Sequence, residues 1–216
     1  MQYEGFENEF HSGNIHLYCG DCMDLMRQTP DKHFSLACVD PPYGLDKRLS
    51  SGGGQHKFSK FRLQYVGKEW DEVPTDEFFG ELFRISENEI ICGANYFRLP
   101  PTRGIVCWDK LQMMQTFSRW EYLWTSYDAP ARTYEERSTD PDRIHPTQKP
   151  VALYKWLLKN YAKTGDTILD THGGSFSSAI ACHQMGFDFV GVEKDEEYFN
   201  TAVKRFKQYQ SQGVLF

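Results

Sequence analysis

Residues 34–43, FSLACVDPPY, join a mostly apolar run to a polar turn. A continuous apolar run of this length is typical of a strand in a parallel sheet, because both faces of such a strand are covered by helices. Asp40-Pro41-Pro42-Tyr43 follows at once. In open α/β sheets, ligands bind outside the carboxyl ends of the strands. The stretch therefore predicts a parallel α/β sheet with a polar site that begins at position 40.

Short apolar runs alternate with helical patterns on both sides of this stretch. The runs that predict strands are 15–18, 34–39, 89–92, 105–108, 122–126, 167–169 and 187–192. Residues 75–86 and 151–161 repeat apolar side chains at helical spacing. A last helix begins with acids at 195–197 and carries basic residues at 204–207, the charge order that a helix dipole favours. The alternation predicts a doubly wound α/β domain with a mostly parallel, seven-stranded sheet.

Length and composition fit a single domain over residues 1–216. The chain has 216 residues, of which 40% are hydrophobic and 15% aromatic, enough for one sizeable core. It contains no run of the ~18 apolar residues that a membrane helix needs, and its first residues lack the pattern of a secretion signal. We expect a cytoplasmic protein without a membrane partner. Its six cysteines are expected to be reduced thiols.

Charge is distributed unevenly along the chain. The net charge is −6, yet residues 44–68 hold one acid, Asp46, and six basic side chains: Lys47, Arg48, Lys57, Lys60, Arg62 and Lys68. A solvated surface loop and a phosphate-binding loop are both consistent with this pattern. Segments 44–72 and 127–149 are longer than ordinary connections, and such loops are usually functional or disordered. Within the second segment, residues 127–144 form a short candidate for sequence recognition.

The turn at Asp40 has the chemistry to bind an amine on a planar ring. Two prolines fix an extended path, so that the carbonyl groups point outward as acceptors. Asp40 adds a carboxylate and Tyr43 an aromatic face. An exocyclic amine can donate one hydrogen to Asp40 and another to the carbonyl of Pro41 while Tyr43 stacks on its ring. The structural alternative is a double-proline turn that merely ends a strand.

Asp40 to Tyr43 resembles the catalytic motif of the amino-group DNA methyltransferases that use S-adenosyl-L-methionine. Four further segments resemble this family in order. Residues 14–24 look like the strand and turn whose Asp21 and Cys22 lie near the cofactor's adenine, and 145–150, HPTQKP, look like the segment that brings Thr147 and Lys149 near the methionine carboxylate. Residues 170–175, DTHGGS, stand where the family has its glycine-rich loop, and Glu193 matches the acid that binds the ribose. The implied loop contacts are Asp170, Thr171, Gly173, Gly174 and Ser175.

The order of these segments is similar to the circularly permuted β group of the family. The DPPY motif comes first, and HPTQKP directly precedes the glycine-rich loop. The resemblance spans roughly residues 14–206 and includes 91–97, 104–110 and 117–126, which look like the later strands of the group. It implies a Rossmann-like methyltransferase fold. The strand, glycine turn and helix after Thr167, with a carboxylate about twenty residues later, are independently typical of a nucleoside site.

One departure concerns the glycine-rich loop, which in the family usually has a second glycine where this chain has Phe176. We expect Phe176 to begin the following helix while Gly173 and Gly174 make the close turn, and Asp170 still to receive the methionine ammonium. His172 is interpreted as a packed core residue. Cys19 and Cys22 lack a second pair at zinc-ligand spacing and are interpreted as buried thiols, so no metal is expected. Three alternating aromatics are interpreted as sheet packing: Trp120, Tyr122 and Trp124.

The resemblance implies direct methyl transfer to an exocyclic nitrogen of a flipped-out base, with Asp40, Pro41, Pro42 and Tyr43 as the catalytic turn. An aspartate at the start of the motif favours adenine N6 over cytosine N4. The basic residues from Lys47 to Lys68 would contact DNA phosphates. A homodimer is expected, and residues 212–216, QGVLF, resemble a sliding-clamp peptide. Cytosine N4 methylation, a non-catalytic cofactor-binding regulator and a nicotinamide oxidoreductase remain as alternatives.

Overall fold

The computed structural model describes residues 2–44, 72–112, 118–138, 143–145 and 147–211. Within these ranges nine strands form one sheet in the order β1-β2-β9-β8-β3-β4-β6-β5-β7. The strands are β1 (Asn8–Ser12), β2 (Ile15–Cys19), β3 (Phe34–Val39), β4 (Ser86–Cys92), β5 (Ile105–Asp109), β6 (Trp120–Thr125), β7 (Arg132–Glu135), β8 (Thr167–Asp170) and β9 (Asp188–Glu193). The helices are α1 (Cys22–Gln28), α4 (Asp76–Ile85), the 3-10 helix η1 (Ala94–Tyr96), α5 (Val151–Tyr161), α6 (Ser177–Met185) and α7 (Glu196–Ser211).

The sheet is mostly parallel. Strands β2, β9, β8, β3 and β4 pair in parallel, and β5 pairs in parallel with β7. Antiparallel pairs join β1 to β2 and place β6 between β4 and β5. All seven predicted strands are present, but the predicted strand count was wrong, because β1 and β7 were missed. Both lie at the ends of the strand order and carry mostly polar residues, and edge strands of that kind give little apolar signal.

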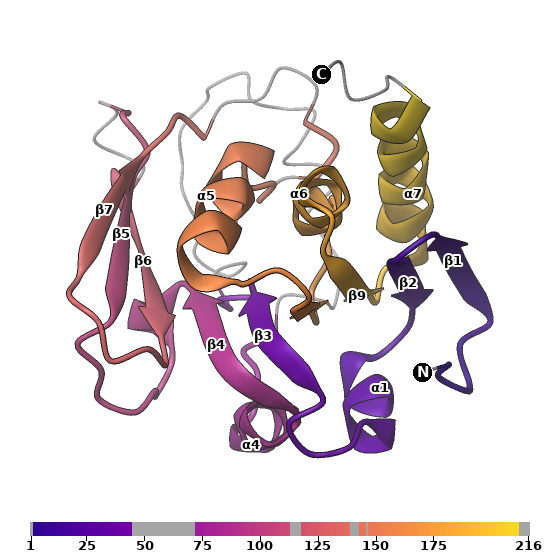
Figure 1. Ribbon diagram of the computed structural model, residues 1–216, viewed down its shortest axis with the longest axis horizontal. Coiled ribbons are helices and arrows are strands. Elements are labelled where there is room, and N and C mark those ends of the chain that lie inside the picture. The colour runs from indigo at the N-terminus through magenta and orange to yellow at the C-terminus, as the bar shows by residue number, and fades with distance from the viewer. Residues whose placement is uncertain (1, 45–71, 113–117, 139–142, 146, 212–216) are drawn as a thin grey trace, which may run out of the picture.

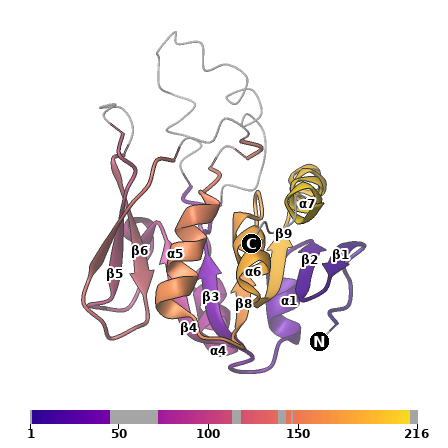
Figure 2. The same ribbon diagram turned by 45° about the horizontal axis from the view of Figure 1, so that its top comes forward.

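Helices cover both faces of the sheet, as Figures 1 and 2 show. On one face α5, α6 and α7 pack against apolar side chains of β2, β3, β4, β5, β6, β8 and β9. On the other face α1 and α4 pack against the alternate side chains of the central strands. Successive residues of β3 divide between the two cores, Leu36 and Cys38 facing one and Ala37 and Val39 the other. This two-sided burial is the physical reason for the continuous apolar run in the sequence.

The helix bounds follow local capping signals. Thr75 accepts a hydrogen bond from the backbone N–H of Phe78 and begins α4 at Asp76. Helix α5 spans the predicted residues, and α4 and α7 differ from prediction only near their ends. The short helix α1 was not predicted. Asp21 caps it by accepting from the N–H of Met23 at 2.9 Å.

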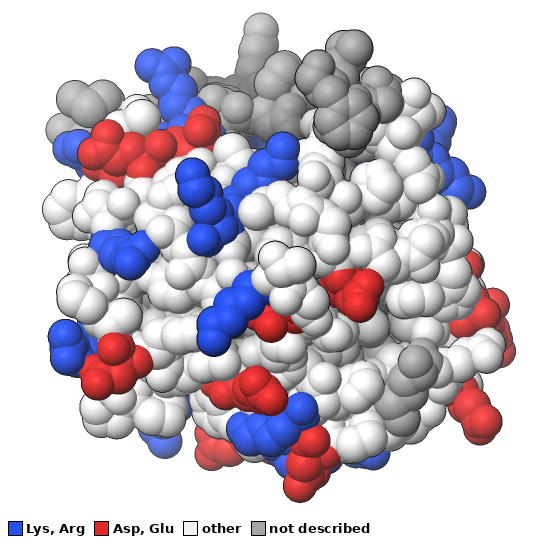
Figure 3. Space-filling model, in the orientation of Figure 1, with Lys and Arg blue, Asp and Glu red and all other residues white. Residues whose placement is uncertain are grey.

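The fold brings four carboxyl-terminal strand ends to one edge of the sheet. Strands β2, β3, β8 and β9 are parallel to one another, so Asp40, the loop after Asp170 and Glu193 lie along the same edge. On the face covered by α5, α6 and α7, charged side chains of both signs are interspersed among uncharged ones (Figure 3). No helix in the described part of the chain is both long enough and apolar enough to span a membrane.

Candidate active site

A cavity of about 430 Å³ lies at this edge of the sheet, within the size range of small-molecule sites. The four residues of the predicted catalytic turn line it: Asp40, Pro41, Pro42 and Tyr43. Most of the predicted cofactor residues line the same cavity: Asp21, Cys22, Thr147, Lys149, Thr171, Gly173, Gly174, Ser175 and Glu193. Segments that are up to about 170 residues apart in the sequence thus meet around one space. Asp170 is not among the lining residues.

Asp40 stands at the carboxyl end of β3 and is held by two partners. The hydroxyl of Tyr43 donates to its Oδ1 at 2.6 Å, and the ammonium of Lys149 pairs with its Oδ2. The side chain of Asp40 is 14% exposed and that of Lys149 is 4% exposed. The lysine precedes α5, so the segment HPTQKP is joined directly to the catalytic turn. In the structure two acids, the partly exposed Asp40 and the buried Glu121, hold the ammonium of Lys149, and its expected contact with a methionine carboxylate stays a prediction.

The second acid is Glu121 on β6. Its Oε1 accepts from Lys149 at 2.9 Å and lies 3.1 Å from the hydroxyl oxygen of Tyr43. Its Oε2 pairs with Lys110 at 2.7 Å. Burial alone would raise the pKa of Glu121, but the two ammonium groups outweigh burial and lower it to about 2. Glu121 is therefore ionised. The Asp40 cluster, defined as Asp40, Tyr43, Lys110, Glu121 and Lys149, joins two carboxylates to two ammonium groups and a phenol.

Tyr43 has an aromatic neighbour. Its ring stacks on that of Tyr96 in η1, with a centroid separation of 4.7 Å and an angle of 12° between the planes. Gly93, with φ of +70°, lies beside the same ring, and a Cβ atom there would come within 2.2 Å of it. A glycine is thus required on both conformational and steric grounds. Tyr96 was not predicted as a site residue, and it lies against one face of the ring that we expected to stack on the target base.

At the other end of the cavity, Glu193 organises the glycine-rich loop. Its Oε2 accepts from the N–H of Gly174 at 2.7 Å, and its Oε1 accepts from the N–H of Asp195 at 2.8 Å. Burial raises the pKa of its carboxyl group. Gly173 and Gly174 line the cavity with backbone only, so a ligand can approach them closely. Asp21 also lines this end, where Lys194 pairs with it at 3.1 Å.

Phe176 explains how the loop closes without its usual second glycine. The residue adopts a left-handed conformation, with φ of 51° and ψ of 38°, and it caps α6 rather than forming its first turn. We had expected Phe176 to begin that helix, which instead starts at Ser177. The ring is fully buried and lies so close to Gly173 that a Cβ there would meet it at 2.0 Å. Phe176 thus has the backbone conformation that glycine favours, and its side chain fills the core beneath the turn.

Asp170 lies behind the loop. Its carboxylate accepts from the hydroxyl of Ser178 at 2.5 Å and from the N–H of His172 at 3.1 Å. Burial raises its pKa to about 7. Asp170 is 1% exposed. Its carboxylate would have to turn toward the cavity to make the expected contact with a methionine ammonium. That contact stays a prediction.

Two interpretations from the sequence need correction. His172 is not packed inside the core: it lines the cavity, its ring lies edge-on to Phe78 at 5.3 Å, and burial lowers its pKa to about 4. Trp124 packs against Phe83 of α4 as expected, but Trp120 and Tyr122 are 49% and 41% exposed. The reason is that α4 covers the central strands. Among the described residues of β5, β6 and β7, only Trp124 belongs to the core on the face of the sheet that α4 covers.

Glu121 and Lys110 were not predicted as site residues. A signal for Glu121 was available in the alternation of residues 120–123, WEYL, where the acid falls on the same face as Leu123. In the structure Glu121 and Leu123 are buried and the residues between and before them are exposed. A glutamate that points into a core needs a partner, which would have directed attention to the lysines.

Several predicted residues lie outside the part of the chain that the structure describes. They are the basic residues Lys47, Arg48, Lys57, Lys60, Arg62 and Lys68, and the clamp-like residues 212–216. Of the candidate recognition segment, residues 139–142 are also outside it, and β7 occupies part of the remainder. All six cysteines are free thiols, but Cys19 and Cys22 are half-buried rather than buried as interpreted, because they flank the cavity end of β2 and Cys22 lines the cavity.

Comparison with known families agrees with this geometry. Residues 107–204 match a family described as DNA methylase (N6_N4_Mtase). The likeness to DNA methylases covers this part of the chain, slightly less than half of it. The match includes β6 with Glu121, the segment with Lys149, the glycine-rich loop and Glu193. The catalytic turn at Asp40 precedes the matched range.

Two curated proteins are similar to this chain in sequence. The type II methyltransferase M.HinfI of Haemophilus influenzae is 22% identical over 248 residues, which cover 88% of this chain and 67% of that protein. The DNA adenine methyltransferase YhdJ of Escherichia coli is 38% identical over 61 residues, 28% of this chain and 21% of the relative. The second likeness is thus confined to a small part of both proteins.

Solved structures confirm the fold class. The PvuII DNA methyltransferase, described as cytosine-N4-specific, superposes with a TM-score of 0.63 at 11% identity and covers 96% of both chains. The complex of M1.HpyAVI with SAM superposes with a TM-score of 0.58 at 19% identity, covering 88% of this chain and 99% of the other. At these identities the likeness shows the α/β methyltransferase fold. The expected circular permutation of motif order stays a prediction.

Proposed function

We propose that the protein transfers a methyl group from S-adenosyl-L-methionine to the exocyclic amine of a base in DNA. The observation that carries the proposal is the position of Asp40. Its carboxylate closes a parallel strand, lines the cavity and lies beside two prolines and a tyrosine. A structural double-proline turn has no need of a partly exposed, ion-paired acid on a cavity wall.

The residues around the cavity fit S-adenosyl-L-methionine. Glu193 presents acceptors for ribose hydroxyl groups at one end, and the backbone of Gly173 and Gly174 leaves room for close approach. Acids at the cavity, Asp40 among them, suit a positively charged sulfonium. The M1.HpyAVI structure, which shares the fold, is a complex with the same compound. When bound, this cofactor supplies an activated methyl group.

The chain's own residues would bind and orient the amine. Asp40 accepts one amine hydrogen and the carbonyl of Pro41 accepts the other, which leaves the nitrogen lone pair directed at the methyl donor. The amine is itself the nucleophile, so the six thiols need take no part. After transfer, the proton that the nitrogen sheds passes to the carboxylate of Asp40. Tyr43 holds the ring of a base flipped out of the duplex.

The proposed target is adenine N6, and cytosine N4 is the alternative. An aspartate at the start of the catalytic turn favours adenine in the family that the motif resembles. The YhdJ relative is described as an adenine methyltransferase, whereas the PvuII enzyme with the same fold is cytosine-N4-specific. The likeness to YhdJ covers a short part of the sequence, and the likeness to the PvuII enzyme is one of fold. The methylated base therefore has to be identified by experiment.

Mass spectrometry of DNA nucleosides tests the function. Unmethylated bacterial DNA is incubated with the protein and S-adenosyl-L-methionine carrying a deuterated methyl group, and then digested to nucleosides. We expect labelled N6-methyladenine. Labelled N4-methylcytosine would support the activity but reverse the choice of base. If neither appears while calorimetry shows binding of the cofactor, the protein is a non-catalytic binder; binding of NAD instead would favour the oxidoreductase.

Further predictions accompany this proposal. The basic residues between Lys47 and Lys68 would contact DNA phosphates near the catalytic turn that they follow in the chain. The homodimer and the clamp contact through residues 212–216 also stay predictions, as does the cytoplasmic location. Sedimentation of the free protein would test the first of these three, and binding to a bacterial sliding clamp the second.

A further inference from the structure

We infer that Glu121 is a positioning residue for Asp40, and that Glu121 and Lys110 together set how firmly Lys149 holds the carboxylate of Asp40. The inference rests on the proposed function and extends it to a residue outside the cavity wall. Glu121 does not line the cavity. It acts through two residues that do, Tyr43 and Lys149.

The contacts form a chain that leads away from the cavity. Lys149 bridges the two acids, since its ammonium pairs with Asp40 and lies 2.9 Å from Glu121 Oε1. Lys110 lies on the far side of Glu121, at 2.7 Å from Oε2. Tyr43 lies between the acids: its single hydroxyl hydrogen is donated to Asp40 at 2.6 Å, while its oxygen is also 3.1 Å from Glu121. Any change in Glu121 therefore reaches Asp40 by two routes.

The charges of the cluster have opposing effects on Asp40. Burial and then the negative charge of Glu121 raise the pKa of Asp40, while Lys149 and the hydroxyl of Tyr43 lower it. Other titratable groups around Asp40 are Cys38 on β3, Cys92 on β4, Tyr154 on α5 and Asp170 on β8. Burial raises the pKa of each of these four groups, which keeps them neutral or, for Asp170, close to its titration at pH 7. Lys149 and Glu121 are thus the charged groups that act most strongly on Asp40, and Lys110 acts on it through its ion pair with Glu121.

A purely structural role does not account for the arrangement. Burying two carboxylates and two ammonium groups costs desolvation free energy, and apolar residues of similar volume often stabilise a fold as well or better. Here the ion pairs converge on Asp40, the acid of the cluster that lines the cavity. Without Glu121, Lys149 would have Asp40 as its remaining acid partner in the cluster. The carboxylate would then be a weaker acceptor for the amine hydrogen.

Two substitutions should shift the titration of Asp40 in opposite directions. Glu121→Gln removes a negative charge at constant size, so the pKa of Asp40 should fall. Lys110→Met removes the cation behind Glu121, so the cluster becomes more negative and the pKa of Asp40 should rise. Methyl transfer requires ionised Asp40 and is lost as the pH falls through its pKa. In the pH profile of the single-turnover rate, the acid limb should therefore move to lower pH in Glu121→Gln and to higher pH in Lys110→Met. We expect a shift of about half a pH unit or more in each variant.

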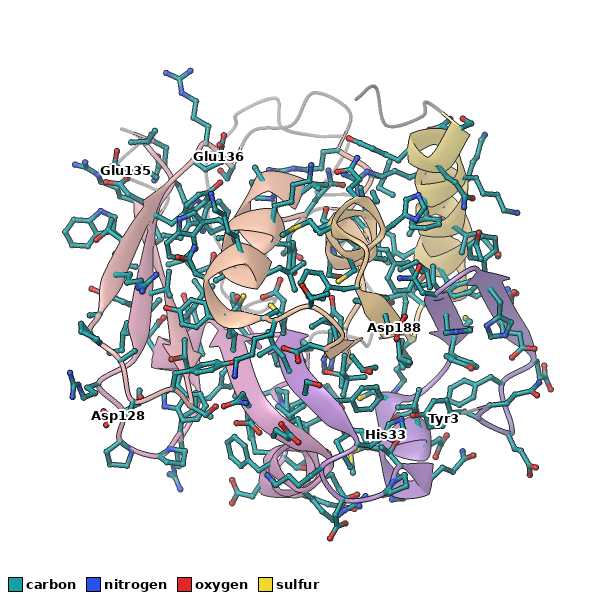
Figure 4. All side chains as sticks on the ribbon, viewed as in Figure 1. Tyr3, His33, Asp128, Glu135, Glu136 and Asp188 are labelled. Carbon is teal, nitrogen blue, oxygen red and sulfur yellow. The ribbon has the colours of Figure 1, made fainter. Side chains whose placement is uncertain are left out.

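The rate and the controls separate positioning from folding. In Glu121→Gln we expect the single-turnover rate on duplex DNA to fall about tenfold at pH 8, with the calorimetric affinity for S-adenosyl-L-methionine within about threefold of the parent. Glu121→Asp, which keeps the charge, should recover part of the rate. Glu135→Gln is the matched control, because Glu135 is an exposed glutamate on the edge strand β7 (Figure 4). It should match the parent in rate and acid limb.

Carbon-13 NMR titration of labelled aspartate carboxyl groups, assigned with Asp40→Asn, gives the same pKa shifts without substrate. Opposite shifts in the two variants support the inference even if the parent fails to methylate DNA, in which case only the proposed function fails. A slower Glu121→Gln with no shift in the titration of Asp40 would overturn the inference and leave Glu121 a structural residue. Should Glu121→Gln not fold, Lys110→Met decides alone: an unmoved or lowered pKa of Asp40 contradicts the inference.

Discussion

Asp40 is the side chain on which the proposed chemistry depends. Asp40→Ala removes the acceptor for the amine hydrogen, so we expect single-turnover methyl transfer to fall by at least ~10²-fold. The variant should fold, because Glu121 still pairs with Lys149. The affinity for S-adenosyl-L-methionine should stay within about threefold of the parent, since the residues at the Glu193 end of the cavity are unchanged. Rapid-quench transfer assays and calorimetry measure the two quantities.

Asp188→Ala is the control for this prediction. Asp188 is an exposed aspartate at the first position of β9, at the opposite end of the sheet from the cavity (Figure 4). Its removal should leave both quantities unchanged. If Asp40→Ala transferred methyl groups at the parental rate, Asp40 would have no part in the reaction.

Single residues were predicted best where a motif fixed their place in the fold. The motif predicts Asp40 and Tyr43 at a ligand site, and both line the cavity. The sequence could not show that Tyr96 stacks on Tyr43 or that Glu121 shares Lys149, because these contacts join residues far apart in the chain. Asp170 is the opposite case. The motif predicts that it contacts a ligand, but in the structure α6 places the hydroxyl of Ser178 against its carboxylate.

Among the elements, the turn between β8 and α6 differs most from the family pattern. Phe176→Gly would relieve the strain of the left-handed backbone, which costs ~1–2 kcal/mol. It would also remove a buried ring that stabilises the fold by ~3–5 kcal/mol. We therefore expect the variant to lose about 1–4 kcal/mol of unfolding free energy, measured by urea denaturation. Burial of the ring should outweigh the strain of the backbone.

Gly174→Ala isolates the backbone contribution. Gly174 has the same φ of +51°, and a Cβ there would meet the ring of His145 at an ordinary 3.5 Å. We expect this variant to lose about 1–2 kcal/mol, mainly from strain. A Phe176→Gly protein as stable as the parent would show that the ring contributes little to the core.

Elements were predictable to the extent that they are amphipathic or buried. Helix α5 was predicted at its exact bounds because its apolar face is regular and Pro150 precedes it. Strands β1 and β7 were missed because most of their residues are polar. The exposure of Trp120 and Tyr122 could not be foreseen, since it depends on where α4 ends over the sheet rather than on the strand itself.

At the scale of the whole molecule, an acidic protein is proposed to bind a polyanion through one basic segment. If Lys47, Arg48, Lys57, Lys60, Arg62 and Lys68 each neutralise a phosphate, changing all six to Gln should reduce the slope of log affinity against log salt by about 5. Fluorescence anisotropy with a labelled duplex measures this slope. Lys155→Gln/Lys159→Gln on α5 is the control and should change the slope little. An unaltered slope in the sixfold variant would exclude this segment from the DNA interface.

The arrangement of the whole fold was predictable because the hydrophobic pattern and the motifs indicated the same architecture. Alternating strands and helices predicted the parallel sheet, and the motif order placed the catalytic turn and the glycine-rich loop at one edge of it. What the sequence left open was the electrostatic organisation of that edge. The charge of a buried cluster depends on which side chains meet, and this follows from packing rather than from any local pattern.

The central claim is that the cavity at this edge holds the methyl donor beside Asp40. A crystal structure of the protein with S-adenosyl-L-methionine tests it most directly. We predict the ribose at Glu193, the glycine-rich loop against the ligand and the sulfonium methyl group directed toward the carboxylate of Asp40 and the carbonyl of Pro41. Ligand bound elsewhere, or bound with its methyl group directed away from Asp40, would contradict the account.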